Sequence, residues 1–208
     1  MDTEALALAL GELGSATLGE SGGTAMRPRI RPAWPGATLA APAYPVRCTP
    51  GDNLAVHVGV TRAPVGSALV VDVGSAAERG YWGEVLTTAA EARSLAGLVI
   101  DGGVRDTAAL EVHRFPVFSS LVALRGATKS LPGTVGLPVV VGGVDVAPGD
   151  WVVGDSDGVV VIPGAVVEDV LAAGRQRAEK EAEYFAQLSA GRTTVELLGL
   201  DEAPVRDR

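Results

Sequence analysis

The sequence of 208 residues predicts an α/β fold: a layered α/β/β/α sandwich with a central βαβ unit, an antiparallel C-terminal section and a long C-terminal helix. Residues 68–101 read as strand, helix and strand, the pattern of a βαβ unit. Residues 138–162 are short apolar runs separated by Gly and Asp turns, which is typical of antiparallel strands. Pro163 opens a helical pattern that continues to about Leu188. This length suits one core, so we expect a single domain, 1–208.

The N-terminal part gives weaker signals. Residues 3–13 carry leucines at helical spacing, and Thr3 is available as the N-cap, so we expect a short helix. Residues 22–36 hold three glycines and three prolines. We expect them to form an irregular connection along the surface.

The next two elements depend on proline and on capping. Residues 37–48 look extended, but Pro42 and Pro45 cannot donate to a sheet ladder, which favours an edge strand or a broken one. Asp52 can then cap a short helix through residues 53–60.

The middle of the chain gives the clearest signals. The apolar run 68–73 predicts a buried strand, and residues 82–95 have the apolar spacing of a helix. A second apolar run, 97–101, ends in a pair of glycines, and residues 115–119 predict one more short strand.

Composition and charge exclude several classes of protein. Hydrophobic residues make up 47% and charged residues 20%, enough for a packed core. The formal net charge of −8 argues against a nucleic-acid partner, and the short run Arg27, Arg29 and Arg31 is expected to be a solvated loop. No apolar run is long enough for a membrane span, and the first 14 residues lack the features of a secretory signal. We therefore expect a cytoplasmic location.

Few side chains are available as soft metal ligands. Cys48 is the single cysteine, and His57 and His113 are the two histidines. One chain therefore cannot build a thiolate or zinc-type site, and any metal should be a hard cation held by carboxylates and water. The two histidines are each expected to be structural.

The residues best suited to chemistry lie at the ends of the predicted strands. In a βαβ unit, ligands bind beyond the carboxyl ends of the strands. The run Gly97–Asp101 leads there into Gly102-Gly103 and then Arg105-Asp106, and the helix that begins after Gly83 should start at the same edge.

Each residue type there suits an anionic ligand and a cation. Arg105 offers a planar fork of donors for a carboxylate or enolate oxygen. Asp106 and Glu84 are hard oxygen ligands, and the free amides of Val85 and Leu86 at a helix start can bind a carboxylate. Alternatively, Arg105 and Asp106 form only a surface ion pair, and Glu84 only favours its helix start.

The chain resembles the family of the regulator of ribonuclease activity A and the 4-hydroxy-4-methyl-2-oxoglutarate aldolases. The resemblance covers nearly the whole length. The motif of an acidic residue, twenty intervening residues and Arg-Asp is met by Glu84, Arg105 and Asp106. The segments that carry the resemblance are PGDNLAVHVGV (50–60), ALVVDVG (68–74), WGEVLTTAAEARSLAGLVIDGGVRD (82–106), FPVFSS (115–120) and GGVDVAPGDWVVGDSDGVVVIP (142–163). The segment Ala41–Pro45 departs from the family's usual Gly-Pro-Ala-x-Thr strand.

The resemblance implies a divalent cation, Mg or Mn, with Asp106 as the protein ligand and Glu84 holding metal-bound water. It implies that Arg105 contacts the 2-oxo oxygen and that the amides of Val85 and Leu86, next to Gly83, bind the substrate carboxylate. It also implies a homotrimer or hexamer in which a glutamate of a neighbouring C-terminal helix joins the site. Glu181 is the candidate, and Glu179 and Glu183 lie in the same helix.

Two function classes follow from this resemblance. One is a lyase that cleaves a 4-hydroxy-2-oxo acid to pyruvate and decarboxylates oxaloacetate, both through the pyruvate enolate. The other is a non-catalytic regulator of a protein partner such as a ribonuclease. Lys129 and Lys180 are the only lysines, and neither is placed near Arg105 by the pattern, so we expect metal rather than Schiff-base chemistry.

Overall fold

The computed structural model describes residues 1–206 and has the expected mixed α/β architecture. Half of its curled main sheet is parallel, in the order β3-β4-β6-β7. Three short strands border this half: β2 pairs β7, β5 pairs β6 and β8 pairs β3. The bounds are β2 Arg31–Pro32, β3 Leu39–Cys48, β4 Ala68–Asp72, β5 Gly80–Trp82, β6 Gly97–Val104, β7 Val117–Val122 and β8 Gly133–Val135.

The other half of the main sheet is antiparallel, in the order β1-β12-β11-β3. The hairpin β9-β10 forms a separate two-stranded sheet. These strands are β1 Thr24–Ala25, β9 Val139–Val141, β10 Val144–Val146, β11 Trp151–Asp155 and β12 Gly158–Ile162. The antiparallel section predicted for residues 138–162 is therefore confirmed.

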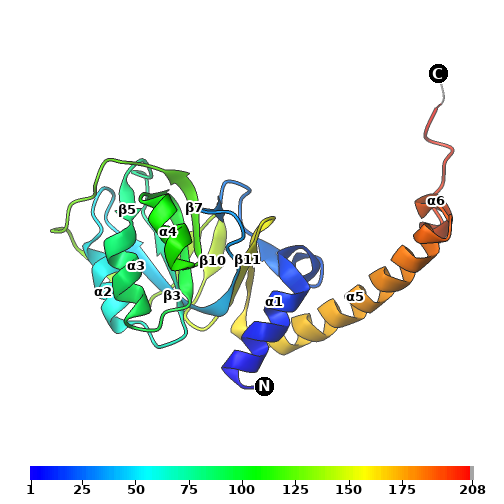
Figure 1. Ribbon diagram of the computed structural model, residues 1–208, viewed down its shortest axis with the longest axis horizontal. Coiled ribbons are helices and arrows are strands. Elements are labelled where there is room, and N and C mark those ends of the chain that lie inside the picture. The colour runs from blue at the N-terminus through cyan, green and yellow to red at the C-terminus, as the bar shows by residue number, and fades with distance from the viewer. Residues whose placement is uncertain (207–208) are drawn as a thin grey trace.

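Helices lie outside both halves, which confirms the layered arrangement (Figure 1). Helices α2 (Leu54–Arg62), α3 (Glu84–Glu91) and α4 (Thr107–His113) lie on the side of the parallel half. Helix α1 (Thr3–Gly19) packs on the antiparallel half and against α5 (Val167–Ser189), which follows the 3₁₀ turn Gly164–Val166. The last helix is α6 (Thr194–Leu198). The buried apolar side chains form two clusters, a large one around the parallel strands and a smaller one between α1, α5, β11 and β12.

The expectation for residues 37–48 is wrong: β3 is a ten-residue strand at the centre of the sheet. Both prolines lie where β3 changes partners. Pro42 is the last residue that pairs with β11, and the parallel ladder with β4 begins at Ala43. The carbonyl of Pro45 accepts from the amide of Gly136, just before the pairing with β8 begins at Val46. Proline has no backbone N–H to donate. At both positions the absent donor therefore falls beside a point where one side of β3 has no paired strand.

Strand β6 also differs from the prediction, because it continues through Gly102-Gly103 to Val104. The pairing register with β7 shifts between Ile100 and Gly103, which is a bulge. A Cβ at Gly103 would lie 2.4 Å from the carbonyl oxygen of Arg79, so glycine is needed for this close approach. Arg105 consequently follows the strand directly.

Smaller differences concern the ends of elements. The N-cap of α1 is Asp2, whose Oδ1 accepts from the amide of Ala5, and Thr3 is the first helical residue. Residues 22–36 do not only follow the surface, because the side chains of Met26, Ile30 and Trp34 are buried. Helices α4 and α6 and strand β5 had no clear signal in the sequence.

Helix α5 projects away from the rest of the chain (Figure 1). Its buried residues end at Gly174, although the helix continues to Ser189, where Ala190 is the C-cap. Phe185 is 62% exposed on the projecting part. Within residues 1–206, none of the helices combines the length and the apolar character that a membrane span requires.

Candidate functional site

A cavity of about 230 Å³ lies at the carboxyl end of β6. It is bordered by the start of α2, by β5 and the start of α3, by the residues after β6 and by the loop that follows β7. The lining residues are Asn53, His57, Gly80, Tyr81, Trp82, Gly83, Val85, Leu86, Arg105, Asp106, Gly126, Ala127 and Lys129. Five of the predicted site residues therefore share one cavity: Gly83, Val85, Leu86, Arg105 and Asp106.

Asp106 connects the end of β6 to the start of α3. Its backbone is in the left-handed region (φ 58°), which aspartate tolerates better than most residues. Its Oδ2 accepts from the amide of Glu84 at 3.1 Å and lies 3.7 Å from Nε of Arg105. A Cβ at Gly83 would lie 2.4 Å from the same oxygen, so this contact requires glycine.

Arg105 is fixed through its backbone and packs against glycines. Its amide donates to the carbonyl of Trp82 at 2.9 Å, which ties the residue to β5. A Cβ at Gly80 would lie 3.1 Å from the side chain of Arg105. The Arg105 side chain is 45% exposed, so the guanidinium borders the cavity and has room to meet a ligand.

The start of α3 offers two free donors. The amide of Glu84 is bound by Asp106, but the amides of Val85 and Leu86 have no protein acceptor among residues 1–206. Below them, the buried Trp82 ring stacks on Phe115, and its Nε1 donates to Thr87 at 2.7 Å. Trp82 therefore serves both the core and the cavity wall and fixes the orientation of the helix start.

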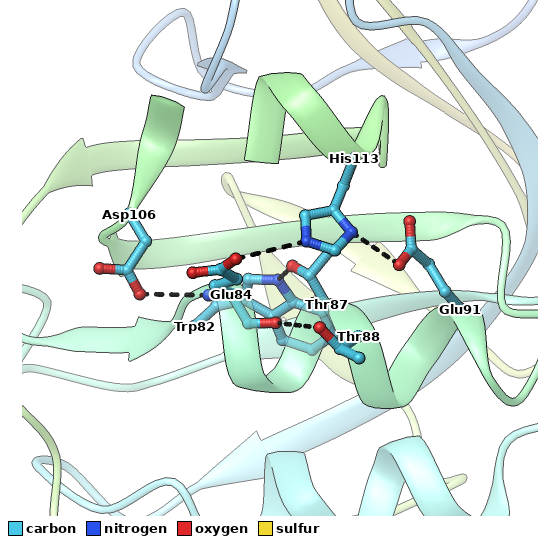
Figure 2. A network of polar contacts seen from close by, with 7 residues as sticks. All are labelled: Trp82, Glu84, Thr87, Thr88, Glu91, Asp106 and His113. Carbon is cyan, nitrogen blue, oxygen red and sulfur yellow. Dashed lines mark hydrogen bonds and ion pairs between the residues drawn. The ribbon is translucent and has the colours of Figure 1, made fainter. Parts of the chain in front are cut away.

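The carboxylate of Glu84 lies beside His113 of α4 (Figure 2). Its Oε1 lies 3.6 Å from Nε2 of His113, whose Nδ1 is 2.8 Å from Oε2 of Glu91. The hydrogen bond with Glu91, together with the charges of Glu91 and Glu84, raises the pKa of His113. The backbone of Glu84 therefore lies beside the cavity. Its side chain is held by an ion pair with His113 of α4, a helix that was not predicted from the sequence.

Asn53 and His57 form the α2 wall of the cavity, and no functional role was predicted for either residue from the sequence. Asn53 is the N-cap of α2, and its Nδ2 donates to the carbonyl of Tyr81 at 2.9 Å. His57 follows one turn later, and burial, followed by the charge of Lys129, lowers its pKa. The available signal was that β3 runs parallel to β4, which brings the residues after β3 to the same edge of the sheet.

Lys129 also lines the cavity, so the expectation that neither lysine lies near Arg105 is wrong for this residue. The buried carboxylate of Asp52 holds its loop. Oδ2 accepts from the hydroxyl of Thr128 and the amides of Ser130 and Leu131, and Oδ1 accepts from the amide of Leu54. Burial alone would raise the pKa of Asp52, but these donors outweigh burial and lower it to about 2. Lys129 itself is exposed.

A cation would find few protein ligands here. In residues 1–206, no three His, Cys, Asp or Glu side chains lie close enough together to hold a metal. Within that range, no protein group hydrogen-bonds Oδ1 of Asp106. Mg²⁺ is typically bound by one or two carboxylates and keeps several waters, so this donor set fits a hydrated hard cation. Glu181 does not line this cavity, and it pairs with Arg177 within α5.

Comparison with known proteins adds a family and a fold. The family model described as RraA-like, Aldolase/RraA, matches residues 11–161. A protein of Halalkalibacterium halodurans named "Putative 4-hydroxy-4-methyl-2-oxoglutarate aldolase" is 35% identical over 154 residues, which cover 74% of this chain and 73% of the relative.

Two solved structures share the fold. An uncharacterized protein from Pseudomonas syringae has a TM-score of 0.83 at 26% identity and covers 92% of both chains. The RNA-processing inhibitor RraA from Thermus thermophilis has a TM-score of 0.62 at 28% identity, over 68% of this chain and 85% of that one. One family therefore includes relatives with an enzyme's name and relatives with an inhibitor's name.

Proposed function

Because this chain belongs to the aldolase/RraA family, we propose that it is a divalent-metal-dependent aldolase. Its substrate would be a 4-hydroxy-2-oxo acid of the 4-hydroxy-4-methyl-2-oxoglutarate type, cleaved to pyruvate, and it would also decarboxylate oxaloacetate. The observation that carries the proposal is the junction of Asp106, Arg105 and the start of α3 at one cavity.

The cavity suits a small anion with a carboxylate and an adjacent oxo group. The free amides of Val85 and Leu86 would bind the C1 carboxylate, since a helix start favours negative charge. The guanidinium of Arg105 would then donate to the 2-oxo oxygen. Negative charge develops on that oxygen in both reactions, so a donor already in place lowers both barriers.

A hydrated Mg or Mn ion would be held by Asp106, and Glu84 would accept hydrogen bonds from its water ligands. Bound there, the cation would withdraw electrons from the 2-oxo group as a Lewis acid. Glu84 would have to turn from His113 toward Asp106, which a side chain that is 57% exposed has room to do.

We further propose a homotrimer or hexamer. The projecting part of α5 buries none of its residues in its own chain. Glu181 lies on this part, and in such an assembly the arm would carry it to the cavity of a neighbouring subunit. A carboxylate from the neighbour would add the ligand that one chain lacks.

A second candidate function is the binding of a protein partner without catalysis. The likeness to the RNA-processing inhibitor RraA favours it. The two functions predict different results with oxaloacetate, because a regulator without catalytic activity does not release carbon dioxide.

The test is oxaloacetate decarboxylation and aldol cleavage with Mg or Mn and with chelator. We expect both activities with metal and neither with EDTA. Borohydride with pyruvate should trap no adduct on Lys129, because a Schiff-base lysine is normally desolvated and this one is exposed. A trapped adduct would contradict the metal mechanism, and a protein inactive on every 2-oxo acid would favour the regulator.

A further inference from the structure

The α2 wall of the cavity carries two polar atoms that have no partner. Oδ1 of Asn53 and Nε2 of His57 are buried, and no group of residues 1–206 forms a hydrogen bond with them. Both residues line the same cavity as Arg105. Buried polar atoms are nearly always hydrogen-bonded in folded proteins, so a pair of exceptions in one cavity points to a ligand.

The orientation of Asn53 is fixed by its neighbours. Its Nδ2 donates to the carbonyl of Tyr81, so the atom left without a partner is the acceptor Oδ1. Tyr81 is held in turn, since its hydroxyl accepts from the amide of Gly51 and donates to the carbonyl of Ala76, both at 2.8 Å. A ligand group that approaches Asn53 must therefore be a hydrogen-bond donor.

His57 presents a second acceptor one helical turn away. Its backbone amide donates to the carbonyl of Asn53 at 3.2 Å, which places the two side chains on one face of the start of α2. Burial and the nearby charge of Lys129 lower the pKa of His57, with Asp52 opposing them more weakly, so the imidazole is neutral near pH 7. In the tautomer with a proton on Nδ1, Nε2 is free to accept one.

The proposed substrate has a single donor to offer such a wall. With the C1 carboxylate at the amides of Val85 and Leu86 and the 2-oxo oxygen at Arg105, the remaining groups of a 4-hydroxy-2-oxo diacid are an ionised carboxylate and the 4-hydroxyl. Only the hydroxyl can donate. Aldol cleavage begins with the loss of that hydroxyl proton, so the buried acceptor is of the type that the reaction requires.

We propose that His57 is the catalytic base that takes the proton of the 4-hydroxyl; this rests on the proposed aldolase function. The O–H electron pair forms the C4 carbonyl as the C3–C4 bond breaks. The electron pair of the C3–C4 bond becomes the C2–C3 double bond of the pyruvate enolate, and Arg105 binds the enolate oxygen. Water then protonates C3 to give pyruvate, and His57 returns its proton to the hydroxide that remains.

Oxaloacetate provides the discriminating control, because it gives the same enolate but has no hydroxyl at C4. We expect His57→Gln and His57→Ala to lower the kcat for cleavage of 4-hydroxy-4-methyl-2-oxoglutarate by about 10²-fold or more. Oxaloacetate decarboxylation should stay within about threefold of wild type, since no general base acts on that substrate. Pyruvate affinity, measured by calorimetry, should be unchanged.

Thr61→Ala is the matched control, because Thr61 lies one turn further along α2 and is exposed, and its side chain only donates to the carbonyl of His57. It should leave both activities intact. Equal losses of both activities in the folded His57 variants, or no loss in either, would overturn the assignment. A wild type that only decarboxylates would also overturn it, whereas a wild type with neither activity contradicts the proposed function itself.

Discussion

At the scale of single residues, Arg105 and Asp106 form the part of the site on which the proposed chemistry depends most. Both lie at the cavity, and each is about half exposed, so neither is needed to fill the core. Substitution at either position should therefore change activity more than stability, which makes their roles separable by experiment.

Asp106→Ala should abolish metal binding and turnover together, because Asp106 would be the only ligand from its own chain in direct contact with the cation. Arg105→Lys keeps the charge but loses the planar fork and should lower kcat by about 10²–10³-fold. Glu84→Ala should cost about 10–100-fold, since Glu84 acts through water. Steady-state kinetics and Mn²⁺ titration measure these effects. Wild-type decarboxylation in both Arg105→Lys and Asp106→Ala would contradict the site assignment.

Asp52→Asn tests the buried carboxylate that holds the Lys129 loop. An amide in its place keeps one acceptor oxygen for Ser130 and Leu131 and turns its NH2 group toward the amide of Leu54, so we expect a loss of about 2–3 kcal/mol in unfolding free energy at pH 7. The pKa of Asp52 is lowered from 3.8 to about 2, so its contribution is present above pH 4 and is lost as pH falls toward 2. Urea unfolding at several pH values should therefore show the gap between variant and wild type closing in acid. A constant gap would contradict this origin.

At the scale of elements, the sequence predicted the strands and helices whose apolar pattern is strong, and missed what depends on pairing. β4, the hairpin β11-β12 and α5 are where the pattern places them, and β6 begins at the predicted residue. β3 was demoted because prolines normally interrupt a ladder, and only the change of partners along the strand shows why they are tolerated.

Because β3 was expected at the edge of the sheet, the α2 wall of the cavity was not predicted either. With β3 at the edge, the segment after it has no reason to meet Arg105. With β3 parallel to β4, Asn53 and His57 lie at the shared carboxyl edge. The orientation of Glu84 was equally out of reach, because it depends on His113 at the end of a seven-residue helix without a clear signal.

Gly83→Ala tests how closely α3 must approach the residue after β6. The added Cβ would meet Oδ2 of Asp106 at 2.4 Å, so the carboxylate must move. A displacement of about 1 Å at such a site costs on the order of 10²-fold in kcat. Gly11→Ala is the control, because its Cβ would be 3.9 Å from the nearest atom and should leave activity unchanged. Full activity in Gly83→Ala would show that Asp106 needs no fixed position.

At the scale of the whole molecule, the projecting part of α5 is the feature that one chain does not explain. Light scattering at micromolar concentration should give a trimer or hexamer. Phe185→Glu should shift the protein toward monomer, because it places a charge on an exposed apolar side chain of the arm. Val65→Glu is the control, because it places the same charge on a side chain that is 78% exposed but lies outside the arm, in the loop between α2 and β4. It should leave the assembly intact. A wild type that is only monomeric would exclude the proposed assembly.

Strand β3 has a further consequence, for the cooperativity of unfolding. It pairs with β4, β8 and β11, so the two hydrophobic clusters share one backbone segment. Neither cluster can lose its strands without exposing the ladder of the other, and so the two should melt as one unit. Trp34 and Trp82 lie in the larger cluster and Trp151 in the smaller, which gives each cluster its own fluorophore. In each variant that keeps one tryptophan, its fluorescence and the far-UV circular dichroism should give coincident denaturation midpoints, the mark of a two-state transition.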